Sequence, residues 1–327
     1  MNTSFDVVVI GGGAAGLSGA LMLTRSRRSV LVIDAGEPRN APAEGVHGFL
    51  SRDGMNPFEL LELGRAEVRR YGGEVISGRV SFARREDDGF AVATDFGGQF
   101  SARRLLVTTG LVDELPAVPG VRERWGRDVV HCPYCHGWEV RDRAIGVLAN
   151  GSAGGAAHMA LLFRQLSSDV TVFLHTASGL SEADAERLRA REIRVVNGIV
   201  NSLVVECDEL RGIKLQDGRH VPLQALVAVP RFVARSEVLT QLGLQTTPHP
   251  QGMGEFIQAD AMGQTAVPGV YVAGNVNDLS ANVIASAAAG SRAGAAINAD
   301  LVSEDVDRCW RHQPVPPTTG AIAHAAS

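Results

Sequence analysis

Two cysteines separated by two residues, Cys132 and Cys135, are the side chains of this sequence best suited to chemistry. Thiols at this spacing can close into a disulfide if the backbone turns between them, and the pair then takes up or releases two electrons together. His136 follows directly, and the ordinary pKa of histidine allows it to exchange a proton near neutrality. The alternative for His136 is a structural role as a cap of the turn. The segment therefore predicts a redox centre.

Zinc is the other chemistry that a Cys-x-x-Cys pair serves, but it needs two further ligands. The two remaining cysteines, Cys207 and Cys309, are isolated, and the sequence has no second Cys-x-x-Cys pair and no His-x3-His spacing. We therefore expect no metal site. Cys207 lies in a strand-like pattern and is expected to be a small buried hydrophobe. Cys309, beside Trp310, is either without a redox role or half of a second pair formed with a partner subunit.

Three neighbours of the pair have two interpretations each. His131 either packs at the end of a strand or helps to deprotonate a substrate. Tyr134 and Trp138 are expected in the core, as aromatic side chains usually are, and the alternative is that they line an apolar pocket.

A glycine-rich turn near the N-terminus indicates a nucleotide site. Gly11, Gly13 and Gly16 follow an apolar strand at residues 6–10 and precede a helix at 17–25, and Asp34 ends the next strand. In this pattern the first glycine makes the turn, the second admits a pyrophosphate to the backbone, and the third lets helix and strand pack closely. The helix N-terminus favours phosphates, and the carboxylate binds ribose hydroxyls. We predict a bound dinucleotide here.

A second glycine turn, near the C-terminus, indicates which dinucleotide the protein binds. Ala273-Gly274-Asn275 ends an apolar strand, and Val283 begins an Ala-rich helix expected over residues 282–301. Flavoproteins place ribityl and pyrophosphate contacts at such a turn. This favours FAD as the cofactor.

The supersecondary pattern repeats inside the chain. Residues 145–148 form a second apolar strand, followed by a turn at 149–155, a helix at 156–166 and a strand at 170–174. Continuous apolar runs indicate parallel sheets covered on both faces. We expect an α/β fold with two nucleotide-binding, Rossmann-like three-layer domains. Residues 57–71 form an amphipathic helix in this interpretation, residues 74–100 a small antiparallel sheet, and residues 314–327 a disordered tail.

Composition and charge exclude several classes of protein. A formal net charge of −5 leaves no basic footprint for nucleic acid and no polybasic membrane patch. The N-terminal strand is not a signal peptide, and no apolar run approaches the roughly 20 residues of a membrane span. We expect a soluble cytoplasmic protein, in a compartment where a Cys-x-x-Cys pair is redox-active.

Together these motifs resemble the low-molecular-weight thioredoxin reductase family of flavoproteins over nearly the whole chain. The resemblance rests on the N-terminal glycine turn, on Thr108-Thr109-Gly110, on Cys132-Pro133-Tyr134-Cys135 and on residues 269–278. It implies a homodimer with an FAD domain from residues 1–115 and 246–327, and a central domain at 116–245 with the cysteine pair. The junctions are expected at 115–120 and 241–254. The candidate FAD contacts are Gly11, Gly13, Ala14, Ala15, Gly16, Asp34, Ala35, Arg39, Asn40, His47, Val80, Thr109, Gly110, Gly274, Asn275 and Val283.

Three departures separate this sequence from typical reductases. The family has an aspartate after the second cysteine, where this chain has His136. The turn that binds NADPH in the family has lost its first glycine, since Ala149 stands there. The arginines that hold the 2′-phosphate are replaced by His175-Thr176-Ala177, at a cost of roughly 1.5–3 kcal/mol per charged hydrogen bond. NADPH should therefore be a poor substrate, and the central domain either uses NADH or is structural.

The same departures are similar to the dithiol oxidase branch of the family, whose members close the disulfides of natural products such as gliotoxin and holomycin. The resemblance implies attack of a substrate thiolate on Cys132, electron transfer from Cys135 to FAD, and reoxidation by O2 to H2O2. An NAD(P)H-dependent thioredoxin or disulfide reductase is the first alternative. A reductase that takes electrons from a carrier such as ferredoxin and a non-catalytic flavoprotein are the others.

Overall fold

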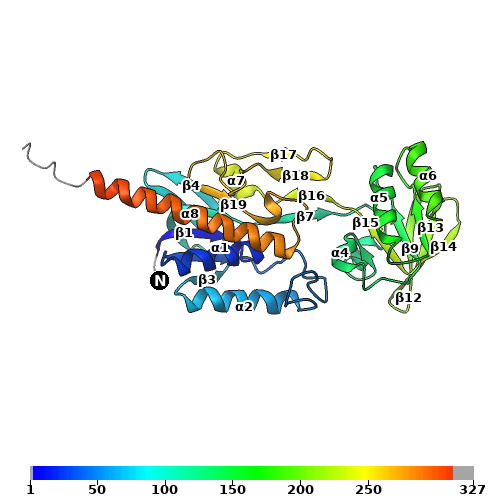
Figure 1. Ribbon diagram of the computed structural model, residues 1–327, viewed down its shortest axis with the longest axis horizontal. Coiled ribbons are helices and arrows are strands. Elements are labelled where there is room, and N and C mark those ends of the chain that lie inside the picture. Colours follow the sequence, from blue (N-terminus) through cyan, green and yellow to red (C-terminus); the bar gives the residue numbers. More distant parts are fainter. Residues whose placement is uncertain (1–2, 312–327) are drawn as a thin grey trace, which may run out of the picture.

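Two large sheets, one in each half of Figure 1, organise the chain. The sheet of the first unit is mixed, and that of the second unit is parallel. The computed structural model describes residues 3–311. The first unit lies at the left of the figure and combines both ends of the described chain, while the second unit lies at the right. A pair of strands connects them. The tail at 314–327, for which the sequence predicts disorder, lies outside the described residues.

The sheet of the first unit has seven strands in the order β3-β2-β1-β6-β5-β4, with β19 also beside β6. The strands are β1 (Ser4–Ile10), β2 (Val30–Asp34), β3 (Glu74–Ser77), β4 (Val80–Glu86), β5 (Gly89–Thr94), β6 (Gln99–Val107) and β19 (Val270–Val272). The predicted antiparallel pairing within residues 74–100 is confirmed for β4, β5 and β6, but these strands extend the large sheet and do not form a small one of their own. β3 pairs in parallel with β2, and the long β6 pairs with β5 through its first half and with β19 through its second.

Both faces of this sheet are covered, which explains the uninterrupted apolar runs. Val8 of β1 packs into one core with residues of α7 and β18, and Val7 and Val9 pack into a second core with residues of α1 and α8. All three valines are completely buried. The prediction of a parallel sheet covered on both sides is therefore confirmed.

Four helical segments complete the first unit: α1 (Ala14–Arg25), α2 (Pro57–Arg70), η1 (Gly274–Val276) and α8 (Val283–Arg311). α2 begins where predicted because Asn56 caps it, accepting a hydrogen bond from the Phe58 N–H at 2.9 Å. α8 runs beyond the expected end at residue 301. Ion pairs from Arg103 to Glu304 and Asp305 hold this extension against β6.

The second unit repeats the layered plan on a smaller scale. Its parallel sheet has the order β11-β10-β9-β15-β8. Two helices pack on one face, and a three-stranded antiparallel sheet packs on the other. The elements are α3 (Val121–Arg124), β8 (Val129–Val130), α4 (Pro133–His136), β9 (Ile145–Leu148), α5 (Ala153–Phe163), β10 (Val170–Phe173), α6 (Glu182–Ala190), β11 (Arg194–Val196), β12 (Val200–Glu206), β13 (Glu209–Leu215), β14 (His220–Pro222) and β15 (Ala225–Ala228). The predicted α/β fold is confirmed in both units.

A four-stranded sheet of order β17-β18-β16-β7 lies where the chain crosses between the units. Its strands are β7 (Leu111–Glu114), β16 (Arg231–Ala234), β17 (Thr246–Pro248) and β18 (Gly254–Ile257), and α7 (Glu237–Gln241) follows β16. The outgoing β7 and the returning β16 pair antiparallel. Val238 and Leu239 already belong to the core of the first unit. We therefore propose that the second junction lies near Val229, not at 241–254.

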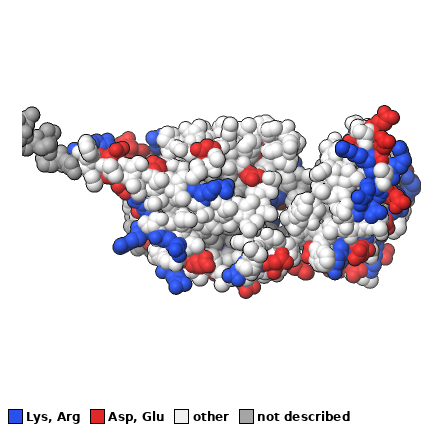
Figure 2. Space-filling view, in the orientation of Figure 1, with Lys and Arg blue, Asp and Glu red and all other residues white. Residues whose placement is uncertain are grey.

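The surface in Figure 2 carries charges of both signs, interspersed with broad uncharged areas. Acidic and basic side chains lie close together over the second unit at the right of that view.

Among the helices of residues 3–311, none has both the length and the apolar content to cross a membrane.

Candidate active site

A cavity of about 800 Å³ lies between the two units and brings most of the predicted site residues together. Its walls come from the loops after β1, β2 and β6, from η1 and the start of α8, and from α4 of the second unit. Ligands bind in parallel-sheet proteins at this position, outside the carboxyl ends of the strands. The volume lies within the range of small-molecule sites, about 300–1,000 Å³.

The first glycine turn opens into this cavity. Gly11 has φ +105°, and a side chain there would meet the Thr108 carbonyl oxygen at 2.5 Å. Nothing lies within 4 Å of the position that a Cβ would take at Gly13. Gly16 faces away from the cavity, and a Cβ there would lie 1.9 Å from the Gly11 oxygen. The turn thus offers a tight bend, an open backbone and a close helix–strand contact.

Asp34 lies on the cavity wall at the end of β2. Its Oδ1 accepts a hydrogen bond from the Gly12 N–H at 3.1 Å, and its Oδ2 accepts one from Arg65 at 2.8 Å. Each carboxylate oxygen can accept a second bond, so both can still bind a ligand hydroxyl. Arg65 was missed because nothing in the sequence of α2 distinguishes it from the other arginines of that helix.

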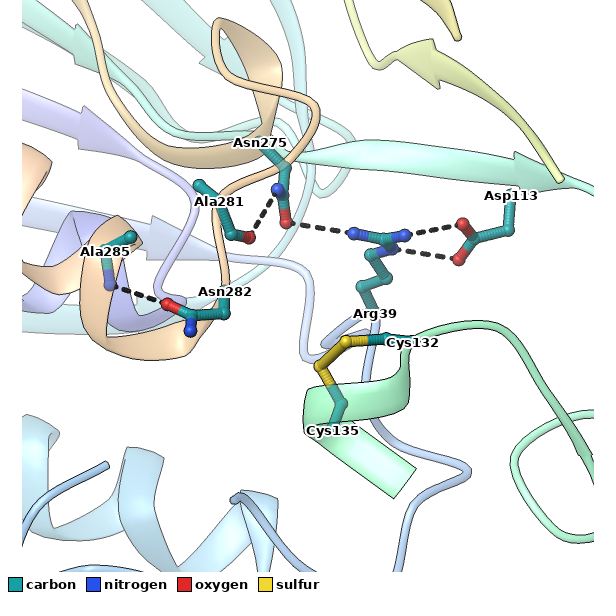
Figure 3. Close-up of a disulfide and its surroundings, with 8 residues drawn as sticks. All are labelled: Arg39, Asp113, Cys132, Cys135, Asn275, Ala281, Asn282 and Ala285. Atoms are coloured by element: carbon teal, nitrogen blue, oxygen red, sulfur yellow. Dashed lines mark hydrogen bonds and ion pairs between the residues drawn. A yellow bond between two sulfur atoms is a disulfide. The ribbon is translucent and has the colours of Figure 1, made fainter. Parts of the chain in front are cut away.

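Arg39 connects several of the segments that line the cavity, as Figure 3 shows. Its guanidinium donates two hydrogen bonds to Asp113, at 2.9 and 2.7 Å, and one to Asn275 Oδ1 at 3.3 Å. It also lies 5.0 Å from the ring centroid of Phe232. The guanidinium therefore ties together the loop after β2, β7, η1 and β16. Neither Asp113 nor Phe232 was among the predicted site residues.

Cys132 and Cys135 form a disulfide that faces the cavity from the second unit (Figure 3). Cys132 precedes the first residue of the short helix α4, and Cys135 lies within it, with 5.2 Å between the two Cα atoms. Pro133 occupies the first helical position, which suits its fixed φ. The backbone turn that the disulfide requires is thus present. The glycine turn of the first unit and the disulfide of the second line one cavity.

His136 ends α4 and also lines the cavity. Its Nε2 is buried without a hydrogen-bond partner in the described structure, so this nitrogen does not cap the turn. Burial lowers the pKa of His136, and His47 lowers it further, while the nearby Glu139 carboxylate opposes the shift. The imidazole is consequently biased toward the neutral form, which can accept a proton.

His47 lies on the cavity wall between two carboxylates. Its Nε2 is 3.4 Å from Glu139 Oε1, and its Nδ1 is 3.5 Å from Asp53 Oδ1. Glu139 belongs to the second unit, whereas His47 and Asp53 belong to the loop between β2 and α2 of the first. This contact across the cavity rim was not predicted.

The structure tests the two interpretations given above for each neighbour of the cysteine pair. His131 packs between Trp125 and Phe232, with ring centroids 6.1 and 5.5 Å away, and burial lowers its pKa to about 4. It is neutral near pH 7, and its position supports the packing interpretation. The expectation that Tyr134 and Trp138 belong to the core is wrong, because they are 76% and 65% exposed. Tyr134 lines the cavity, and Trp138 stacks under Arg141.

The expectation that Cys207 is buried is also wrong. It is exposed, with φ +50°, in the hairpin turn between β12 and β13. The sequence pattern typical of strands continues on both sides of this turn, so the turn was not predicted. Cys309 is exposed near the end of α8.

Within residues 3–311, no group of three His, Cys, Asp or Glu side chains is arranged to hold a metal ion.

The second glycine turn is closed by its own hydrogen bonds. The Gly151 N–H donates to Thr176 Oγ1 at 3.1 Å, and the Thr176 hydroxyl donates to Asn150 Oδ1 at 3.3 Å. Ser152 caps α5 by accepting from the Gly155 N–H, and His175 Nδ1 accepts from the Val200 N–H at 3.0 Å. Of the described residues that line the cavity, none comes from 149–154.

The cavity brings together nearly all of the predicted site residues. With the exception of Gly16, those on its wall are Gly11, Gly13, Ala14, Ala15, Asp34, Ala35, Arg39, Asn40, His47, Val80, Thr109, Gly110, Cys132, Cys135, His136, Gly274, Asn275 and Val283. The apolar side chains of the cavity wall include Trp125, Met159, Leu162 and Phe232, which were missed because they come from three separate segments.

Comparisons with known proteins agree with this arrangement. The model of the pyridine nucleotide-disulphide oxidoreductase family matches residues 5–294. Thioredoxin reductase tcpT of Claviceps purpurea is 31% identical, over 93% of this chain and 97% of its own. Thioredoxin reductase sirT of Leptosphaeria maculans is 29% identical, over 92% and 96% of the two chains. The crystal structure of HlmI is 49% identical, covers 94% of this chain and 96% of its own, and has a TM-score of 0.86.

Proposed function

Because the chain belongs to the pyridine nucleotide-disulphide oxidoreductase family, among its thioredoxin reductase-like members, we propose that it is an FAD-dependent dithiol oxidase. It would form an intramolecular disulfide in a small natural-product dithiol through Cys132 and Cys135, with O2 as the electron acceptor and H2O2 as the product. The main support for this proposal is a difference between the glycine turn at residues 11–16 and the one at residues 149–154. The disulfide shares a cavity with the open first turn, whereas the second turn is closed.

The residues of the first unit fit FAD. The open backbone at Gly13 and the N-terminus of α1 suit a pyrophosphate, and the Asp34 carboxylate suits a ribose. Asn275 and Val283 border the same cavity from the C-terminal segment. Bound FAD would accept two electrons from the cysteine pair and pass them to O2.

The cysteine pair would carry out the thiol chemistry by two exchanges. A substrate thiolate attacks Cys132 Sγ, the Cys132–Cys135 bond breaks, and Cys135 leaves as the thiolate. The second substrate thiol then attacks the sulfur bound to Cys132, which releases the cyclic disulfide. The two electrons that leave the substrate are now held by the cysteine thiols.

His136 would accept the proton that the attacking substrate thiol loses. It lies on the cavity wall one residue after Cys135, and burial biases its ring toward the neutral form that can act as a base. The neighbouring apolar wall, which includes Trp125 and Phe232, favours a substrate with an apolar body. We further propose a cytoplasmic homodimer, in keeping with the family.

An NAD(P)H-dependent disulfide reductase is the alternative within the same family. It requires a second nucleotide site, and two observations argue against one. The Gly151 N–H already donates to Thr176, and no lysine or arginine is present at 175–177. The first observation makes backbone contact with a pyrophosphate unfavourable, and the second leaves a 2′-phosphate without a cation.

The decisive test follows the visible absorbance of the purified flavoprotein without oxygen. We expect dithiothreitol to bleach the flavin and NADPH to leave it oxidised. Admission of air should restore the absorbance and generate H2O2. The variants C132S and C135S should retain flavin but not bleach. Rapid bleaching by NADPH would assign the protein to the reductases, and no bleaching by either compound would indicate a non-catalytic flavoprotein.

A further inference from the structure

His47 connects the cavity to the molecular surface through two carboxylates. Its side chain is 24% exposed and lines the cavity, whereas Asp53, on its outer side, is 69% exposed. Glu139, on the other side of the ring, is 41% exposed and follows His136 by three residues. The three groups thus form a row from Glu139, three residues after His136, through His47 to the exposed Asp53.

His136 lies three residues before Glu139 in the sequence and lines the same cavity as His47. Its Nε2 is buried and has no hydrogen-bond partner among the described residues. The ionisable groups that act on it are Glu139, which favours the protonated form, and His47, which opposes it. His131, which also lines the cavity, is neutral near pH 7 because burial lowers its pKa to about 4. A proton on His136 is therefore attracted only toward Glu139.

The chemistry of the proposed function requires such a proton to move, and the inference rests on that function. Closing a disulfide in a dithiol releases two electrons and two protons, and reduction of O2 to H2O2 later consumes both. Between these two events, a proton taken by His136 must leave the ring before the next thiol can be deprotonated. A buried base without an exit would remain charged after one exchange.

We propose that Glu139 and His47 carry the proton from His136 to solvent, with Asp53 at the outer end of the path. A carboxylate and an imidazole in contact can exchange one proton without separating charge. His47 acts through His136 and is therefore a positioning residue for proton transfer. Because the pair joins the two units, it also holds the cysteine segment against the loop of the first unit.

The first test is chemical rescue. In H47A we expect the anaerobic rate of bleaching by dithiothreitol to fall by about tenfold or more, and free imidazole to restore most of it. H220A is the matched control, because His220 is an exposed histidine on β14 and does not line the cavity. Neither the loss nor the rescue should occur there.

The second test measures His136 itself and needs no turnover. NMR of the oxidised protein with 13C-labelled histidine follows the His136 titration, assigned by comparison with H136N. H47Q should raise the pKa of His136, because it removes an opposing charge, and E139Q should lower it, because it removes a favourable one. If neither variant changes the pKa of His136, the two groups are not coupled to it and the proton path is wrong.

Failure of the proposed function and failure of the proton path give different results. If dithiothreitol does not bleach the wild-type flavin, the proposed function itself fails. If the wild type bleaches but H47A is as fast, or is slow and not rescued by imidazole, the proton path is wrong. Loss of flavin from H47A would also overturn it, and would instead support His47 as a cofactor contact.

Discussion

The turn at Gly11–Gly16 and the turn at Ala149–Gly154 both follow a buried parallel strand and precede a helix, yet their backbone amides have different partners. In the first turn the backbone at Gly13 is open to the cavity, and Asp34 lies beside it. In the second, the Gly151 N–H is bonded to Thr176, and Ser152 occupies the start of α5.

This difference shows that a strand–turn–helix unit is not by itself a nucleotide site. Its backbone plan provides a row of N–H donors at a helix N-terminus, which bind an anion only when no side chain has taken them. In the first unit the Gly12 N–H is bonded to Asp34, but the backbone at Gly13 is open to the cavity. In the second, the Gly151 N–H is bonded to the Thr176 hydroxyl and the Gly155 N–H to the Ser152 hydroxyl, which supports our proposal that this unit positions the cysteine segment and binds no nucleotide.

The largest expected effect concerns the third glycine of the first turn. A methyl group in G16A would lie 1.9 Å from the Gly11 oxygen, so we expect a loss of about 3 kcal/mol in the free energy of unfolding, with loss of flavin. G154A is the matched change in the second turn, where the nearest atom is 3.7 Å away. It should stabilise the helix by up to about 1 kcal/mol. Urea unfolding and the flavin-to-protein ratio measure both effects, and equal destabilisation would remove the distinction.

A smaller effect is expected at the acidic residue of the first turn. D34N leaves an acceptor for the Gly12 N–H but removes the negative charge that pairs with Arg65. We expect FAD to bind about tenfold to hundredfold more weakly, the equivalent of one charged hydrogen bond. The comparison variant is D217N, whose carboxylate accepts from the Arg219 N–H and pairs with the Arg219 guanidinium at the surface, outside the cavity. Dissociation constants from apoprotein titration decide the question, and similar values for both variants would contradict the role of Asp34.

The smallest effect is expected from reopening the second turn. T176A frees the Gly151 N–H, and S178R adds a cation at an exposed position beside it. Each change alone should alter NADPH binding by less than about twofold, and the double variant should strengthen it about threefold, as for an exposed ion pair. Isothermal titration with NADPH is the measurement. Strong binding to the wild type would show that the closed turn does not exclude the nucleotide.

The sequence was sufficient for the local features of the molecule. Both strand–turn–helix units, the covered parallel sheets and the turn between Cys132 and Cys135 depend on residues adjacent in sequence, whose periodicity and glycine spacing are readable. The cavity wall was predicted well for the same reason, since most of its cofactor-side residues lie within three short motifs.

Contacts between distant segments were not predictable from such patterns. The bonds from Arg39 to Asp113 and Asn275 join residues separated by 74 and 236 positions. The His47–Glu139 pair depends on how the two units lie against each other. Exposure was also misjudged for Cys207, because a two-residue turn between strands has little sequence signal of its own.

The first sheet has a consequence for how the protein is made. β19 completes the second half of β6, and α8 packs on α1, so residues beyond 270 are needed to finish a core that begins at β1. The elements of the second unit are contiguous, from α3 to β15. During synthesis on the ribosome, this inner unit can fold while the outer one still lacks its final strand. Until β19 emerges, the edge of β6 that it later covers has no partner strand, which makes the nascent chain vulnerable to aggregation.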